Sequence, residues 1–268
     1  GEIVIALGMT EPNAGSAVTD LTTKAVEDGE GYRVSGSKVF TSNSPDAEIF
    51  LVYVRYHEGI NGIGSVLIDR TMDGFTLGKP SKYTNGEEWC ALYFDNVYVP
   101  KENILLGPGG FKKQIAGFNA ERIGNSARSL AVGEFAYNLA KEHALTREQF
   151  GRKICEFQGV QWKFSDMKIQ IEAGRLLLYR AAINADKGFP SSKDTSIAKA
   201  FCNKAGFDIC NEAMQIMGGM GYSQESLVEY CFRKSRGWQI AGGSTEMMKN
   251  RIAEDIFERR FSQRPTKK

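Results

Sequence analysis

The period of the apolar residues changes once along the chain, close to Leu106-Gly107-Pro108, and this change limits the folds that the chain can adopt. Ahead of it lie short runs rich in β-branched and aromatic residues, separated by Gly, Pro, Asn and Asp: residues 2–7, 32–40, 48–56, 62–70 and 91–99. Beyond it, apolar residues recur every three or four positions. We therefore predict an α+β chain, in which residues 1–108 form an antiparallel β-barrel or sandwich and residues 109–268 form a four-helix-type bundle.

The second half contains enough periodic sequence for several helices. One seam of residues spaced alternately four and three apart indicates bundle packing: Val160, Phe164, Met167, Ile171, Gly174 and Leu178. Glycine, proline and capping residues indicate where the helices begin and end. We expect helices over about residues 110–146, from Phe157 to a break at Gly188-Phe189-Pro190, from Ser191 to Gly218, over about residues 225–236, and from Ser244 onward.

The composition excludes several classes of protein. With 42% hydrophobic and 25% charged residues among 268, the chain has an ordinary globular composition. It holds no apolar run near the ~18 residues of a membrane span, and we expect no secretory signal. Five cysteines without a CxxC pair, and only two histidines, predict neither a disulfide scaffold nor a metal site. We expect a reducing compartment, the cytoplasm or, in a eukaryote, the mitochondrial matrix.

The net charge of +2 conceals an uneven distribution. Residues 1–106 contain 8 Lys and Arg against 15 Asp and Glu, whereas residues 107–268 contain 26 against 17. The basic residues of the second part are interleaved with acidic ones at helical spacing, which is typical of solvated helix faces. We therefore expect no nucleic acid partner. A small ligand rich in phosphate needs only a few of these cations.

Common nucleotide and metal signatures are absent, since the chain has no GxGxxG after a strand, no Walker loop and no HExxH. Five other segments occur in order along the chain: Met9–Ser16, Lys38–Asn43, Arg147–Arg152, Gln215–Tyr222 and Gly242–Glu246. Together they resemble segments of the acyl-CoA dehydrogenase family of flavoproteins. The resemblance extends over essentially the whole chain.

The resemblance implies an enzyme of fatty acid metabolism that contains FAD. In this family a glutamate removes the α proton of an acyl-CoA thioester, hydride passes to flavin N5, and electrons leave to an electron-transferring flavoprotein. The family also implies a homotetramer or a dimer of dimers.

Alternatives to this function remain open at the level of the sequence. They are a member acting on a carrier-protein thioester, an oxidase, and a non-catalytic subunit that completes the flavin site of a heteromeric enzyme. Family members carry a helical domain ahead of the segment that matches Met9–Ser16, and this sequence begins just before that segment. We expect that domain to be truncated here, lost, or supplied by a separate subunit.

In the first domain, the resemblance assigns FAD contacts to Met9, Thr10, Gly15, Ser16, Phe40 and Ser42. Short hydroxyl side chains and a glycine suit the close approach of a flavin edge or a phosphate. Phe40 can lie against the isoalloxazine ring, and Ser42, on the same side of the strand, would donate to N5. A plain turn for the first segment and a strand with one core Phe for the second are the alternatives without a cofactor.

In the second domain, the resemblance assigns further FAD contacts to Arg147, Phe150, Gln215, Gly219, Ser244 and Glu246. The first four would contact the pyrophosphate and adenosine part of a flavin bound mainly by a neighbouring subunit. The last two lie where a helix N-terminus can bind an anion. A solvated arginine and a glycine helix cap are the plain alternatives.

The position of the catalytic base separates this chain from most of the family. Most members carry a Glu directly before the Gly-Thr/Ser of the last segment, where this chain has Gly242. A subset, which includes the isovaleryl- and long-chain-type enzymes, carries it on the first bundle helix, where this chain has Glu121. The resemblance therefore makes Glu121 the base, and the Gly242 N–H a donor to the thioester oxygen. A charged pair with Arg122 on a solvated helix face is the plain alternative.

Three neighbours of the base are expected to flank the substrate: Phe118, Asn119 and Arg122. Residues 82–90 lack the Gly-x-Arg-x-Ser pattern that is usual in the family. The sequence therefore does not define the length or branching of the acyl chain.

Overall fold

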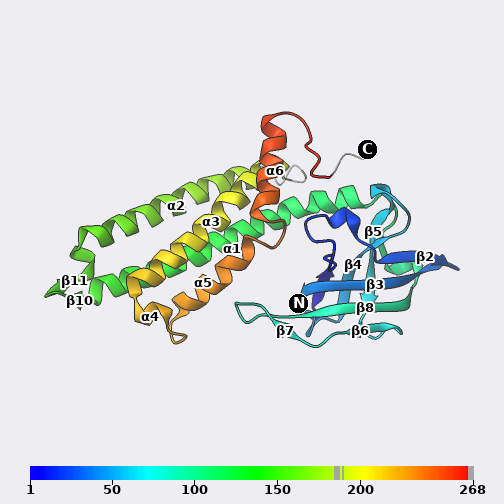
Figure 1. Cartoon of the computed structure of the whole chain (residues 1–268), viewed down its shortest axis with the longest axis horizontal. Helices are drawn as coiled ribbons and strands as arrows, with labels where there is room; N and C mark the ends of the chain where they lie inside the picture. Colours follow the sequence, from blue (N-terminus) through cyan, green and yellow to red (C-terminus); the bar gives the residue numbers. More distant parts are fainter. Residues whose placement is uncertain (184–187, 189, 265–268) are drawn as a thin grey trace. The chain divides into compact units, whose positions relative to one another are not determined.

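The computed structural model describes residues 1–183, 188 and 190–264. The chain divides into two compact units, residues 1–115 and residues 116–268, and this division falls in the first turns of helix α1 (Figure 1). The first unit is built from strands and the second from helices. The predicted α+β class is therefore confirmed.

The first unit contains one nine-stranded sheet in the order β6-β8-β3-β2-β4-β5-β9, with β1 paired to β4 and β7 paired to β8. The strands are β1 (Ile5–Gly8), β2 (Lys24–Asp28), β3 (Gly31–Ser42), β4 (Ile49–Arg55), β5 (Ile63–Asp69), β6 (Phe75–Leu77), β7 (Ser81–Lys82), β8 (Glu88–Val99) and β9 (Ile104–Leu106). All five predicted runs overlap a strand. Strands β2, β6, β7 and β9 were not predicted, because they are short and carry no apolar alternation long enough to detect.

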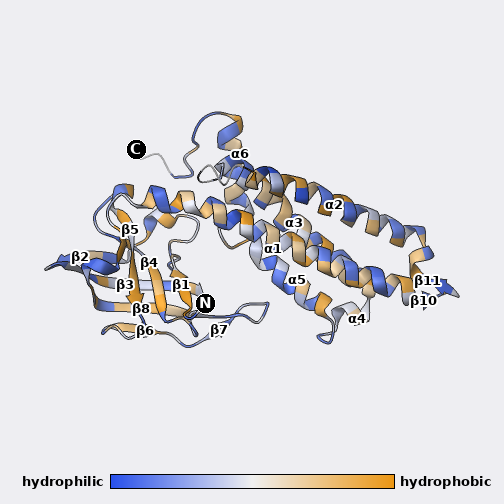
Figure 2. Cartoon of the chain, turned by 180° about the vertical axis from the view of Figure 1, so that it is seen from behind, coloured by the Kyte–Doolittle hydropathy of each residue, from blue (hydrophilic) through white to orange (hydrophobic). Residues whose placement is uncertain are grey.

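The sheet surrounds one core because its two halves face each other. A single residue pair, Lys24 with Arg55, joins β2 to β4 and so links the two halves. Side chains of both halves nevertheless form one buried cluster, which includes Val34, Leu92, Phe94 and Val97 from β3 and β8, and Phe50, Val52, Val54, Val66 and Ile68 from β4 and β5. Figure 2 shows apolar residues concentrated on these strands. Each large side chain buried there contributes ~1.5–3 kcal/mol, which is enough to hold the halves together.

Two strand pairs differ from the expected antiparallel pattern. Strands β1 and β2 both run parallel to β4, while the other pairs of the sheet are antiparallel. The reason is the path of the chain: between β1 and β4 it forms the loop of residues 9–23 and the β2–β3 hairpin. The loop therefore crosses from β1 to β2 and lies next to β3.

The second unit is the predicted helical bundle. Its elements are α1 (Phe111–Thr146, which begins in the first unit), β10 (Glu148–Gln149), β11 (Arg152–Lys153), α2 (Gln158–Ala182), α3 (Ser192–Met217), α4 (Gly219–Tyr222), α5 (Leu227–Trp238) and α6 (Thr245–Ile256). In Figure 1, α1, α2, α3 and α5 run alongside one another and α6 lies across them. The predicted starts at Ser191 and Ser244 are confirmed, since both side chains cap their helices. Of the predicted break at residues 188–190, Phe189 lies outside the described residues.

Helix α3 is the central element of the bundle. It buries residues along its whole length and packs against α1 and α5 through one cluster and against α2 through another. The predicted seam on α2 is confirmed, because Met167, Ile171 and Gly174 are buried. Glycines allow α1 and α3 to approach closely: an added Cβ on Gly133 would lie 3.1 Å from the Cα of Gly206.

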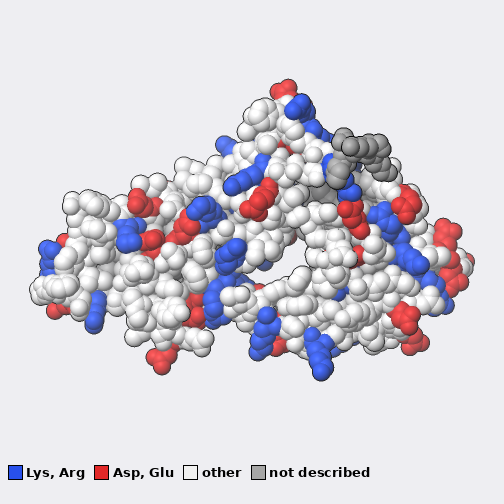
Figure 3. Space-filling view, viewed as in Figure 1, with Lys and Arg blue, Asp and Glu red and all other residues white. Residues whose placement is uncertain are grey.

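The outer faces of the helices are charged. Ion pairs such as Arg175–Glu134, with a nitrogen–oxygen distance of 2.9 Å, link neighbouring helices, and Lys168–Glu172, at 2.6 Å, lies within one helix. Basic and acidic side chains are interleaved over this unit in the view of Figure 3. Among the described residues, no helix has the length and apolar character needed to cross a bilayer.

The close approach of α1 and α3 can be tested by substitution. A Cβ on Gly206 would lie 2.4 Å from the carbonyl oxygen of Ser129, so Gly206→Ala forces the two helices apart. We expect it to lower the free energy of unfolding by about 1–3 kcal/mol in urea denaturation. The matched control is Gly124→Ala on α1, where nothing lies within 4 Å of the added Cβ. Equal stability of the two variants would contradict tight α1–α3 packing.

Candidate active site

A buried ion pair ties the loop of residues 9–16 to strand β3. The Lys38 ammonium lies 2.8 Å from Glu11 Oε1, and the two side chains are 0% and 5% exposed. Lys38 also donates to the Met9 carbonyl at 3.3 Å, and the Val39 N–H donates to the Thr10 carbonyl at 2.8 Å. Met9 and Thr10, two of the predicted flavin residues, are thereby held beside the strand that carries Phe40 and Ser42.

Four further hydrogen bonds hold the Glu11 carboxylate. The backbone N–H and hydroxyl groups of Thr22 and Thr23 donate to its two oxygens at 2.6 to 2.9 Å. Burial raises the pKa of Glu11, but the Lys38 charge and these donors outweigh it and lower the pKa to about 2. Glu11 is therefore ionised throughout the neutral range, and the loop is anchored from both of its sides.

A bulge in β3 places the predicted flavin residues on the exposed side of the sheet. The pairing of β3 with β8 shifts between Lys38 and Thr41, and Phe40 has a left-handed backbone with φ of 56°. The Phe40 side chain is 56% exposed with its ring centroid 4.7 Å from that of Trp89, and Ser42 is also exposed. Thr41 between them is buried. Bulges of this kind re-aim side chains next to functional sites.

The residues of this face fit a flavin. An exposed aromatic ring offers a surface for stacking, and the hydroxyl groups of Thr10, Ser16 and Ser42 offer donors to ring nitrogens and oxygens. Gly15 is exposed, and nothing lies within 4 Å of the position that a Cβ would take, so a ligand can approach the backbone. The structure brings together in one unit all six residues that the sequence analysis assigned to this part of the cofactor.

In the second unit, Glu121 and Gly242 lie side by side, although they are far apart in the sequence. Gly242 has φ of +68°, and a Cβ built on it would lie 2.8 Å from Glu121 Oε2. The Glu121 carboxylate, projecting from α1, therefore occupies the space that a side chain at position 242 would need. The Glu121 side chain is 40% exposed, and its Oε1 lies 3.7 Å from a guanidinium nitrogen of Arg128.

Arg122 and Asn119 connect α1 to the loop that carries Gly242. Arg122 Nε donates to the Gly242 carbonyl at 3.4 Å, and Arg122 Nη1 donates to Asn119 Oδ1 at 2.9 Å. Asn119 is buried and donates to the Pro190 carbonyl at 3.0 Å. Burial and the nearby Arg251 lower the pKa of Arg122, while the Glu121 carboxylate opposes this shift. These two predicted substrate residues thus have structural partners, whereas Phe118 is half-buried.

A buried lysine that was not predicted from the sequence lies next to the proposed base. Lys199 of α3 is 1% exposed and donates to the Trp238 carbonyl at 2.9 Å, and Asn203 donates to the same oxygen at 2.7 Å. Its Cε lies 3.6 Å from the position of a Cβ on Gly242. Burial lowers the pKa of Lys199 to about 8, while Glu121 opposes the shift. The only signal in the sequence is a lysine inside the apolar run of residues 197–201.

The remaining predicted residues of the second unit fall into two groups. Ser244 accepts a hydrogen bond from the Met247 N–H at 3.4 Å and caps α6, whose first turn carries the exposed Glu246. The other group lies toward the end of the bundle where α1 and α3 end (Figure 1): Arg147, Phe150, Gln215 and Gly219, all exposed. Phe150, at the turn of the β10–β11 hairpin, is 94% exposed.

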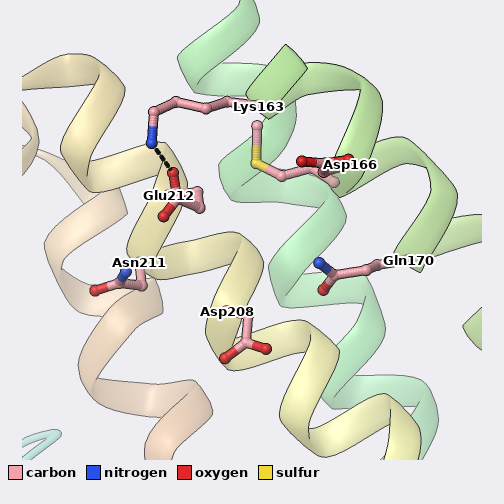
Figure 4. A pocket seen from close by; sticks show the side chains of 7 residues that line it. Lys163, Asp166, Gln170, Asp208, Asn211 and Glu212 are labelled. Atoms are coloured by element: carbon pink, nitrogen blue, oxygen red, sulfur yellow. Dashed lines mark hydrogen bonds and ion pairs between the residues drawn. The ribbon is translucent and has the colours of Figure 1, made fainter. Parts of the chain in front are cut away.

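A separate pocket lies between α2 and α3. It has a volume of about 380 Å³ and is lined by Lys163, Asp166, Met167, Gln170, Asp208, Asn211 and Glu212 (Figure 4). An ion pair between Lys163 and Glu212 crosses it. None of these residues is a predicted site residue. Within the described part of the chain, no three His, Cys, Asp or Glu side chains are placed to hold a metal ion.

Comparison with known proteins assigns the family. Residues 6–97 match the model of the acyl-CoA dehydrogenase middle domain, and residues 108–257 match that of the acyl-CoA dehydrogenase C-terminal domain. The chain belongs to the acyl-CoA dehydrogenase family. The cofactor of this acyl-CoA dehydrogenase is FAD, in agreement with the exposed face of the first unit.

Three relatives illustrate the similarity. The short-chain-specific acyl-CoA dehydrogenase of Clostridium acetobutylicum is 34% identical over 262 residues, which is 96% of this chain and 69% of the relative. The solved butyryl-CoA dehydrogenase of Megasphaera elsdenii is 34% identical with a TM-score of 0.91, covering 95% and 68%. A chain in a structure of the electron transferring flavoprotein of Acidaminococcus fermentans is 34% identical with a TM-score of 0.91, covering 96% and 69%. The chain thus spans about two thirds of the length of these relatives.

The second prediction concerns the buried ion pair between Glu11 and Lys38. Because the pKa of Glu11 is lowered from 4.5 to about 2, its ionised form stabilises the fold above pH 4.5, and this stabilisation is lost as the pH falls toward 2. Glu11→Gln leaves Lys38 buried without its counter-charge, so we expect a loss of ~3–5 kcal/mol of unfolding free energy at pH 7. The difference from the parent protein should shrink as the pH approaches 2, measured by denaturant unfolding from pH 7 downward.

The control for this prediction is Asp28→Asn. Asp28 and Arg33 form an ion pair of similar length, 2.7 Å, but both side chains are more than 40% exposed. Exposed pairs of this kind contribute at most about 1 kcal/mol. A Glu11→Gln effect as small as that of Asp28→Asn, or one independent of pH, would show that the ion pair does not anchor the loop.

Proposed function

We propose that this chain catalyses the FAD-dependent α,β-dehydrogenation of an acyl-CoA thioester. The observation that carries the proposal is the contact between Glu121 and Gly242. The carboxylate that most members attach at the position of Gly242 is supplied to the same space from α1. Loss of the side chain at position 242 and gain of the carboxylate at position 121 therefore compensate each other.

Each of these residues would have a distinct role in the proposed dehydrogenation. Glu121 takes the α proton, and the Gly242 N–H donates to the thioester oxygen as negative charge develops there. Arg122 keeps Gly242 in place through its hydrogen bond to the Gly242 carbonyl. Bound FAD would supply the hydride-accepting chemistry needed for the β hydrogen. Phe40 and Ser42 hold and orient the flavin ring.

The relatives support one class of substrate and one electron-accepting partner. The names of two of them, a short-chain-specific acyl-CoA dehydrogenase and a butyryl-CoA dehydrogenase, support a short acyl chain. The electron transferring flavoprotein structure that contains a similar chain supports such a flavoprotein as the electron acceptor. Five free cysteines support the cytoplasm or, in a eukaryote, the mitochondrial matrix as its compartment.

The third prediction tests the base. Glu121→Gln keeps the shape of the side chain and removes only the proton acceptor, so flavin content should stay near that of the parent. The rate of flavin reduction by butyryl-CoA, monitored as the loss of flavin absorbance in a stopped-flow spectrophotometer, should fall by about 10²–10⁴-fold. The control is Glu142→Gln, an exposed residue on the same helix. A Glu121→Gln protein that reduces its flavin at the parent rate would remove Glu121 from the mechanism, whereas a parent protein that binds FAD but does not reduce it with butyryl-CoA would favour the non-catalytic subunit.

Moving the carboxylate back to position 242 provides a second test. The double variant Glu121→Ala/Gly242→Glu frees the space next to Gly242 and should recover part of the lost rate. In Glu121→Gln/Gly242→Glu the amide still fills that space, so recovery should be smaller. Full recovery is not expected, because the left-handed backbone at Gly242 costs ~1–3 kcal/mol for a residue with a side chain.

We also propose that the chain associates with further copies of itself. Glu121 lies on α1 and Arg147 directly follows the last residue of that helix, 26 residues further along the chain, ~39 Å at 1.5 Å per residue, which is further than one FAD molecule spans. The group of Arg147, Phe150, Gln215 and Gly219 would therefore contact the flavin of another copy. A stripe along α2 and its C-cap supports this: Trp162, Ile169 and Leu176 of the helix and the capping residue Ile183, spaced by seven, are 60% to 75% exposed.

The fourth prediction tests self-association. Ile169→Lys/Leu176→Lys places two charges in the exposed stripe, so the protein should elute as a smaller species in size-exclusion chromatography with light scattering. Flavin content should fall together with the assembly, because the adenosine contacts come from another copy. The control is Asn138→Lys on α1, an exposed polar position outside the stripe. Unchanged assembly in the double variant would contradict the proposed interface.

A further inference from the structure

Residues 82–90, which lack the pattern usual in the family, place Tyr83 next to Ser42, the residue predicted to bind flavin N5. Strand β7 pairs with the start of β8, and the turn between them is closed by hydrogen bonds between Tyr83 and Glu87 and between Gly86 and Tyr83, each 2.9 Å long. The Tyr83 ring stacks on Trp89 with a centroid distance of 6.1 Å. Trp89 in turn contacts Phe40. Tyr83 is therefore held rigidly at the exposed face of the sheet.

Two hydrogen bonds in series connect Ser42 to the backbone of the bulge. Ser42 Oγ donates to the Tyr83 hydroxyl at 3.3 Å, and the Tyr83 hydroxyl donates to the Phe40 carbonyl at 2.9 Å. The carbonyl is available because Phe40 lies in the bulge, where the pairing with β8 is interrupted. The hydroxyl hydrogens of Ser42 and Tyr83 are both used, and the Ser42 oxygen can still accept a hydrogen bond.

We propose that Tyr83 is a positioning residue that raises the reduction potential of the bound flavin through Ser42; this inference rests on the proposed flavin site. Oxidised N5 accepts a hydrogen bond, so Ser42 must turn its single hydrogen toward N5 and away from Tyr83. Reduction by hydride adds two electrons and one proton, so N5 would then carry an N–H that can donate to Ser42. Only when the flavin is reduced can the Ser42 hydroxyl accept from N5 and at the same time donate its hydrogen to the Tyr83 hydroxyl. The hydrogen-bond chain seen in the structure thus favours reduced flavin.

The surroundings of Tyr83 suit this role. Burial raises the pKa of its phenol, while the hydrogen bond with Ser42 opposes the shift, so the hydroxyl stays protonated and can donate and accept at once. Stacking on Trp89 fixes the ring, and the Phe40 carbonyl fixes the direction of the hydroxyl hydrogen. Tyr83 is therefore a better acceptor for Ser42 than a mobile water, because its orientation is already set.

The experiment measures the flavin midpoint potential in Tyr83→Phe by reduction in equilibrium with a reference dye. Without the phenolic oxygen, Ser42 has no fixed acceptor when N5 carries hydrogen. We expect the equilibrium constant for flavin reduction to fall by up to about tenfold, which is ~30 mV to more negative potential for a two-electron couple. Tyr93→Phe, an exposed tyrosine of β8, is the matched control and should leave the potential unchanged.

A double-variant cycle separates an effect through Ser42 from a general effect on the site. In a Ser42→Ala background, Tyr83→Phe should shift the potential no further. An equal shift in both backgrounds, or no shift in the parent background while flavin remains bound, would overturn the role of Tyr83 and leave the proposed function intact. A protein that takes up no FAD would instead overturn the flavin site itself, and this inference with it.

Discussion

The proposed flavin face of this chain depends on one buried ion pair. Glu11 and Lys38 have almost no contact with solvent, and isolated charges in such a place would cost several kcal/mol each. The pair is tolerated because every Glu11 oxygen has donors, two threonine hydroxyls and two backbone N–H groups among them. In return, the loop of residues 9–16 cannot move independently of strand β3. The exposed ring of Phe40 and the hydroxyl of Ser42 keep a fixed position relative to that loop.

In the helical unit, glycines fix the positions of the neighbouring elements, because they allow close approach. Gly133 and Gly206 bring α1 and α3 close together, and Gly242 leaves room for the Glu121 carboxylate. Each of these positions lacks a side chain where a neighbouring element requires the space. Lys199 adds a buried cation at the same place and holds the end of α5 through the Trp238 carbonyl. The proposed base is thus placed by α1, by a loop and by a buried lysine of α3.

The helices could be predicted well and the strands less well, for a physical reason. A helix repeats its pattern within one segment, so the seam on α2 and the caps at Ser191 and Ser244 are visible locally. A strand obtains its partners from elsewhere in the chain. The parallel pairing of β1 and β2 with β4 has no local signature, and neither has the bulge at Phe40. The contacts of Tyr83 and Lys199 could not be predicted for the same reason, since both involve residues distant in sequence.

By itself, the sequence determined the α+β class, the starts of the long helices, the family and the residues that match its segments. These follow from periodicity and from residue types at fixed spacing, which the linear chain contains. Only the tertiary structure decided that the Glu121 carboxylate fills the space at Gly242, that Glu11 and Lys38 form a buried pair, and that Tyr83 meets Ser42. Such contacts are set by the packing of whole elements, because moving one strand or helix by a single residue would separate the groups.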